Sequence, residues 1–169
     1  MKNKRKVIPF RRKREGRTNY KKRIAFLTSE RPRLVIRKSL KNFIAQIIIY
    51  EPKGDKVAAS ACSAELKKLG WKFSGGNTPA AYLVGVLIGK KAKHAKVGEA
   101  IADLGLYQPI KGSKIYAVLK GAVDSGLSIP HDESAIPKAE RIKGRHIADY
   151  KKVDIEKNFD EVLSKIKGK

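Results

Sequence analysis

The sequence predicts an α/β fold in which helices pack on one face of a small sheet. Three strand-like runs are separated by turn residues, two later segments show helical spacing of apolar residues, and a further strand-like segment lies between those two. The order β-β-β-α-β-α is typical of a sheet covered on one face. With 169 residues, 41% of them hydrophobic, the chain can build one such domain with extensions.

The three strand-like runs predict an antiparallel meander. They are Arg33–Lys38, which alternates, Phe43–Tyr50, which is rich in β-branched residues, and Lys56–Cys62, which is small and mildly apolar. Residues 39–42 and 52–55 join them and contain the residue types that turns prefer.

Alternation also predicts the register of the first hairpin. A turn at Leu40-Lys41 pairs Ser39 with Asn42, Arg37 with Ile44, Val35 with Gln46 and Arg33 with Ile48. One face then holds only apolar residues, which are Leu34, Ile36, Phe43, Ala45, Ile47 and Ile49. The other face mixes apolar residues with Arg33, Arg37 and Gln46, and a shift by one residue would mix the two sets. We expect this second face to contact a polyanion, so that replacing both arginines would weaken binding and leave stability nearly unchanged.

The remaining core elements follow from capping signals. Asn77-Thr78-Pro79 is typical of a helix start, and the apolar positions after it recur at helical spacing. Glu99–Leu106 is predicted as the fourth strand. Lys114–Ser125 is predicted as a second helix, preceded by Gly112-Ser113 and ended by Gly126.

Changes in composition divide the chain into a basic arm (1–30), an α/β core domain (31–127) and a loop with a helical C-terminal extension (128–169). Within the extension, Pro137–Tyr150 predicts a short basic helix that Gly144 weakens. The residues from Ile155 to Ile166 form an amphipathic stripe after Asp154. The exposed side of this stripe mixes acidic residues with lysines, so we expect it to dock on protein, either its own core or a neighbour, rather than on a polyanion.

The charge points to a polyanionic partner. The net charge is +23, from 39 basic and 16 acidic residues, and residues 1–23 contain 12 basic residues against one acid, Glu15. Nucleic acid is the first candidate and an anionic membrane surface the second. Such a segment cannot bury enough apolar surface to fold alone. Because it also contains Val7, Ile8, Phe10 and Tyr20, we expect an arm that orders on a phosphate backbone rather than a solubilising tail.

Signals for catalysis are weak. Cys62 is the single cysteine, and the three histidines are far apart in sequence, so no metal-ligand spacing or disulfide is expected. A small enzyme that uses Cys62 is a distant alternative. Gly85–Lys91 (GVLIGKK) lacks the spacing of a phosphate loop, and its glycines are interpreted as close-packing positions. We expect no catalytic residue, metal, cofactor, small-molecule substrate or membrane span.

Clusters of basic residues beside aromatic and polar ones indicate nucleic-acid binding. The segment Trp71–Thr78 (WKFSGGNT) leaves two interpretations open. Its aromatic residues and Gly-Gly pair could present a helix N-terminus to a phosphate, or they could be a core Trp followed by an ordinary helix cap.

Three ordered blocks carry a resemblance to a known family. They read RPRLVIRKSLKNFIAQII, SGGNTPAAYLVGVLIGKKA and IADLGLYQPIKGSKIYAVLKGAVDSGLSIPH, and REGRTNYKKR extends the match toward the start. These blocks resemble the large-subunit ribosomal protein L-eighteen family. The resemblance implies an α/β core that binds 5S rRNA and helps attach it to the large-subunit (23S-type) rRNA in the central protuberance. Neighbouring ribosomal proteins there include the 5S-binding protein L-five.

The extension and the style of the N-terminus resemble the archaeal/eukaryotic branch, and the shortness of the extension favours an archaeal source and a cytoplasmic ribosome. The residues after the fourth strand, from Gly105 to Lys114, depart from the bacterial pattern, which leaves contacts there in doubt. The alternative function is a nucleic-acid-binding protein that is not part of a ribosome.

The family pattern and the basic clusters together give the candidate RNA-binding residues. These are Arg11, Arg12, Lys13, Arg14, Arg17, Tyr20, Lys21, Lys22, Arg23, Arg31, Arg33, Arg37, Ser39, Lys41, Asn42, Gln46, Trp71, Lys72, Ser74, Asn77, Thr78, Lys114, Arg141 and Arg145.

Overall fold

A computed structural model of the chain describes residues 7–168, and its centre is a mixed four-stranded sheet of order β3-β2-β1-β4. The strands are β1 (Arg33–Lys38), β2 (Phe43–Ile49), β3 (Lys56–Cys62) and β4 (Ile101–Asp103). β1, β2 and β3 form the predicted antiparallel meander, and β4 pairs parallel with β1. β4 is shorter than predicted because a turn begins at Leu104, where Gly105 adopts a positive φ of 62°.

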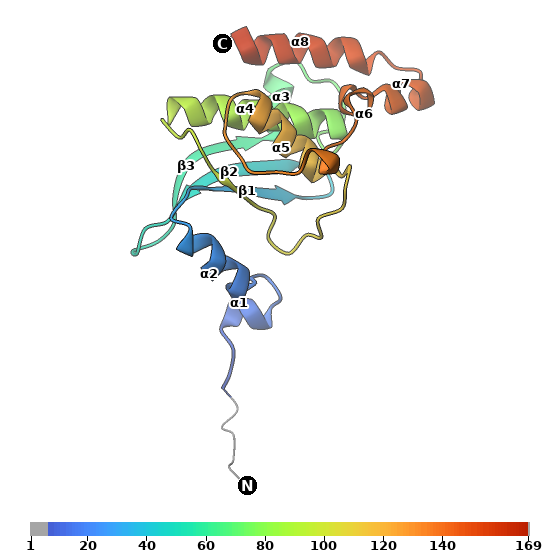
Figure 1. Cartoon of the computed structure of the whole chain (residues 1–169). Helices are drawn as coiled ribbons and strands as arrows, with labels where there is room; N and C mark the ends of the chain where they lie inside the picture. The colour runs from blue at the N-terminus through green and yellow to red at the C-terminus, as the bar shows by residue number, and fades with distance from the viewer. Residues whose placement is uncertain (1–6, 169) are drawn as a thin grey trace.

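The helices are α1 (Arg11–Arg14), α2 (Tyr20–Thr28), α3 (Ser63–Lys68), α4 (Thr78–His94), α5 (Lys114–Asp124), α6 (Ala139–Lys143), α7 (Arg145–Lys151) and α8 (Ile155–Gly168), with a 3-10 turn at Glu133–Ala135. As Figure 1 shows, α4 and α5 cover one face of the sheet, and α8 packs on their outer side. α1 and α2 lie on the opposite side of the sheet from α8.

The first hairpin has the predicted register. Arg37 pairs with Ile44, Val35 with Gln46 and Arg33 with Ile48. The five residues Leu34, Ile36, Phe43, Ala45 and Ile47 are at most 1% exposed beneath the helices. Ile49 is the exception, because the β2–β3 register shifts between Ile47 and Ile48 and leaves the end of the strand exposed.

The helices α4 and α5 cross so closely that their backbones touch. A Cβ added at Gly85 would lie 2.0 Å from the carbonyl oxygen of Val118, and one added at Gly121 would lie 2.2 Å from that of Tyr82. The prediction that Gly85 and Gly89 are close-packing positions is confirmed. This contact sets the distance between the two helices.

Replacing Gly85 by Ala should therefore lower the free energy of unfolding by about 2 kcal/mol or more, because the two helix backbones must separate. Gly98→Ala is the matched control, since a Cβ at Gly98 meets nothing within 4 Å. Urea unfolding of both variants measures the difference. Equal stability of the two would show that the helices do not pack backbone to backbone.

The stripe of α8 packs on the chain's own core. Ile155, Phe159, Val162 and Ile166 are at most 2% exposed. The ring of Phe159 lies 5.6 Å from that of Tyr82 in α4. The apolar stripe of α8 is therefore covered by the protein's own core and not by a neighbouring protein, which was the other alternative.

The helix predicted over Pro137–Tyr150 is instead two helices, α6 and α7. Gly144 separates them with a φ of 94°, and a Cβ there would meet the Pro79 side chain at 2.8 Å. This left-handed backbone interrupts the helix, and the tight packing favours glycine at this point.

One further expectation needs correction. The short helix α3 follows β3 without a turn and was missed, although Glu65 accepts a hydrogen bond from the backbone N–H of Cys62 in the manner of a capping box. The basic arm, which was expected to order on a polyanion, contains the short helices α1 and α2, and neither helix has a buried residue. The second helix continues beyond residue 23 into Phe26 and Leu27, which are half-buried. Residues 1–6 of that arm lie outside the described residues.

Candidate nucleic-acid interface

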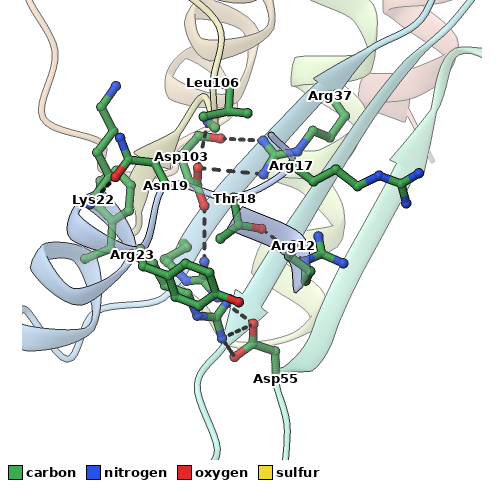
Figure 2. Close-up of a pocket in the computed structure, with 14 residues that line it drawn as sticks. Arg12, Arg17, Thr18, Asn19, Lys22, Arg23, Arg37, Asp55, Asp103 and Leu106 are labelled. Atoms are coloured by element: carbon green, nitrogen blue, oxygen red, sulfur yellow. Dashed lines mark hydrogen bonds and ion pairs between the residues drawn. The ribbon is translucent and has the colours of Figure 1, made fainter. Parts of the chain in front are cut away.

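A hollow of about 560 Å³ lies between the arm and the uncovered face of the sheet (Figure 2). Helices α1 and α2, the segment between them, and β1 supply its cationic residues, which are Arg12, Arg17, Lys22, Arg23, Arg33 and Arg37. Two acids, Asp55 and Asp103, also line it. Arginines can bind phosphate oxygens in a bidentate manner, and this density of cations is suited to a phosphodiester backbone.

Arg33 has an internal role in this hollow. The residue is 4% exposed, its Nη2 lies 2.8 Å from Oδ2 of Asp55, and its Nη1 lies 3.1 Å from Oδ2 of Asp103. Both terminal nitrogens are thus engaged by carboxylates. The expectation that Arg33 is available to RNA, and that its loss would leave stability unchanged, is contradicted by this pairing.

Arg37 keeps its guanidinium accessible. Its side chain is 44% exposed, and Nη1 donates to the carbonyl oxygens of Ile36, at 2.8 Å, and of Asp103, at 3.1 Å. Gly105 lies against this group, since a Cβ there would be 3.0–3.2 Å from the guanidinium atoms. Arg37 is therefore held in place by backbone oxygens while part of its guanidinium remains free to contact a phosphate.

A second hollow of about 820 Å³ continues the first, and Leu106 lines both. It lies between the β1–β2 turn, the loop of residues 106–113 and the start of α5. Its charged lining residues are all cations, namely Lys38, Lys114 and Arg141. Leu40 at the hairpin tip is fully exposed. A cationic rim with an apolar floor can contact both the phosphates and the bases of RNA.

The comparison with known families agrees with this surface. A family model described as ribosomal large subunit proteins 60S L5 and 50S L18 matches residues 4–97 and 92–132. The chain belongs to this family. It is therefore a ribosomal, RNA-binding protein of the large subunit that takes part in translation, and proteins of this kind are generally structural rather than catalytic. The match ends before α6, so the helices that follow are outside it.

In this ribosomal protein the segment Trp71–Thr78 is structural. Trp71 is 3% exposed and donates from Nε1 to the carbonyl of Ser74, and Thr78 is 2% exposed. The side chain of Asn77 caps α4 by accepting from the N–H of Ala80. A Cβ at Gly76 would lie 2.9 Å from the carbonyl oxygen of Leu40, so this loop packs on the hairpin tip. The structure thus favours the core Trp and ordinary cap over a phosphate-binding helix end.

The other predicted residues divide by location. Lys41 and Ser74 are exposed around the hairpin tip. The side-chain oxygen of Asn42 instead accepts a hydrogen bond from the hydroxyl of Ser63 at 2.9 Å. The N–H of Lys72 donates to Asn158 of α8, which places this lysine away from both hollows. The remaining predicted residues outside the hollows are exposed or half-buried, and they are Arg11, Lys13, Arg14, Lys21, Arg31, Gln46 and Arg145.

His146 lies near Arg141, which lines the second hollow. Partial burial and the charge of Arg141 lower the pKa of its imidazole below the ordinary value, and Lys114 acts in the same direction. This shift disfavours a positive charge on the imidazole.

Sequence reasoning missed the acids of the interface. Asp103 lies in the segment predicted as the fourth strand and Asp55 in the predicted second turn, and neither was named as a candidate site residue. Both bind Arg33 from elements far away in sequence. The alternation of β1 placed Arg33 on the right face, but no local pattern indicates which carboxylates meet it there.

No helix within residues 7–168 is both long and apolar enough to cross a membrane. In the same residues, no three His, Cys, Asp or Glu side chains come together as a metal site.

Proposed function

We propose that this ribosomal protein binds 5S rRNA and helps attach it to the large-subunit rRNA in the central protuberance. The observation that carries the proposal is the continuous cationic surface formed by the two hollows, which share Leu106 and lie on a member of this ribosomal family. The neighbours expected there are the 23S-type rRNA and ribosomal proteins such as L-five, in a cytoplasmic ribosome.

The charge distribution supports one RNA-binding side. The arm and β1 supply the cations of the first hollow, and the second hollow has no carboxylate among its lining residues. α8, on the opposite side of the sheet, mixes lysines with Glu156, Asp160 and Glu161 and offers phosphate no net attraction. The arm and the β1–β2 tip would therefore face the RNA, and α8 would face away.

Matched charge variants test this polarity. Lys22→Gln with Arg37→Gln removes two accessible cations of the first hollow, and it should weaken 5S rRNA binding about tenfold or more. Lys157→Gln with Lys167→Gln removes the same charge from exposed positions of α8 and should change affinity less than about threefold. Equal losses in the two double variants would mean that only net charge matters.

The identity of the RNA is tested by purifying the protein from its own cells at high salt and sequencing the RNA that copurifies. Enrichment of 5S rRNA, together with sedimentation in the large subunit, is the expected result. A broad mixture of nucleic acids without ribosomal subunits would support the alternative, a nucleic-acid-binding protein outside the ribosome.

A further inference from the structure

The arm is fastened to the body of the protein at one polar point. α2 buries none of its residues completely. Within residues 7–168, the only side-chain hydrogen bonds or ion pairs that join α1 or α2 to residues beyond the arm are those of Arg23. Its Nη2 lies 3.1 and 3.0 Å from the two oxygens of Asp55, in the loop between β2 and β3. The direction of the arm therefore depends strongly on where Asp55 is held.

Asp55 is itself held by the sheet. Its Oδ2 also accepts from Nη2 of Arg33 at 2.8 Å, and the other side of that guanidinium binds Asp103. Asp103 is fixed in turn by the N–H of Gly105, which donates to its Oδ1 at 2.8 Å. The charges alternate from the arm to the edge of the sheet, in the order Arg23, Asp55, Arg33, Asp103. Figure 2 labels Arg23, Asp55 and Asp103 of this network.

We propose that Asp55 is a positioning residue for RNA binding, which holds α2 so that the cations of the arm and Arg37 face the same hollow. The inference rests on the proposed function. A carboxylate beside a phosphate-binding surface should by itself repel the ligand. Asp55 instead improves binding, because an arm already held in place loses less conformational freedom when RNA binds.

Neutralising Asp55 separates repulsion of phosphate from positioning of the arm, because the two effects change RNA affinity in opposite directions. Asp55→Asn makes the protein more positive by one charge, and if Asp55 only repels phosphate, 5S rRNA should bind more tightly. Positioning predicts the opposite, a loss of roughly fivefold. Asp160→Asn, at an exposed position of α8, adds the same charge and should leave affinity within about twofold. Tighter binding by Asp55→Asn, or binding equal to that of Asp160→Asn, would overturn the proposal.

A double-mutant cycle shows whether Asp55 acts through the arm. If it does, Arg23→Gln with Asp55→Asn should bind 5S rRNA no more weakly than Arg23→Gln alone. Additive losses would mean that Asp55 acts by another route and would overturn the proposal. Thermal unfolding of each variant establishes that all are folded at the assay temperature.

Amide exchange in the free, full-length protein gives a readout without RNA. Asp55→Asn should raise exchange rates in residues 20–28 by several-fold relative to the native chain, and leave those of α8 unchanged. Unchanged exchange in α2 would overturn the inference even if RNA binds. If the native protein does not bind 5S rRNA at all, the proposed function fails, and the exchange result still decides whether Asp55 fixes the arm.

Discussion

Replacing Arg33 by Gln should lower the free energy of unfolding by about 3 kcal/mol or more, since it breaks a buried ion pair and leaves the partner carboxylate uncompensated. Arg33 is 4% exposed, and the side chain of Asp103, one of its two partners, is 9% exposed. Glutamine is shorter and uncharged, and it cannot donate to both carboxylates. Denaturant unfolding of the free protein measures the loss.

Arg37→Gln is the control for this experiment. It removes the same charge from the same strand, but the Arg37 side chain is 44% exposed and its ion-pair distance to Asp103 is 3.8 Å. We expect a change below about 1 kcal/mol. If Arg33→Gln destabilised the protein no more than Arg37→Gln, the buried network would not contribute to folding, and Arg33 would be a surface arginine as the sequence suggested.

Affinity for 5S rRNA should fall steeply with salt. If about eight phosphates are neutralised by Lys and Arg, the logarithm of the binding constant should fall against the logarithm of salt concentration with a slope between roughly −5 and −7. Between 50 and 200 mM salt, this slope corresponds to a loss of about 10³- to 10⁴-fold. Filter binding or anisotropy across that range measures it.

The variants on the two sides of the sheet refine this result. Lys22→Gln with Arg37→Gln should reduce the steepness of the slope by about 1.5, because two phosphate contacts are lost. The α8 pair, Lys157→Gln with Lys167→Gln, should leave the slope as it is. A slope near −1 for the native protein would mean that the charge of the chain serves something other than phosphate binding.

The sheet was predictable because its pattern is local. Alternation in β1 and β2, with turn residues between them, specifies which residues pair and which face of the sheet is covered. The observed register of the hairpin is the predicted one. α3 was missed because the chain passes from strand to helix without a turn, and its N-cap position is Cys62 rather than Ser or Thr. The break between α6 and α7 depends on Gly144 meeting Pro79, a contact between distant parts of the chain.

The candidate site was predictable in kind but not in detail. A dense run of cations indicates a polyanion partner whatever the fold, and the residues of the arm were named for that reason. Burial of Arg33 and Trp71 results from long-range packing, which a basic or aromatic residue type does not reveal. Asp55 could not be recognised as a functional residue from the sequence, because its two arginine partners lie 22 and 32 positions away.

Lysine acetylation of the protein bound to 5S rRNA, read by mass spectrometry, tests most directly which side of the sheet faces RNA. Exposed lysines lie on both sides, with Lys22 in the arm, Lys38 and Lys41 at the hairpin tip, and Lys157 and Lys167 on α8. RNA bound to the two hollows should protect the first three and leave the α8 pair as reactive as in the free protein. Protection of the α8 lysines, with Lys22, Lys38 and Lys41 still reactive, would contradict the proposed interface.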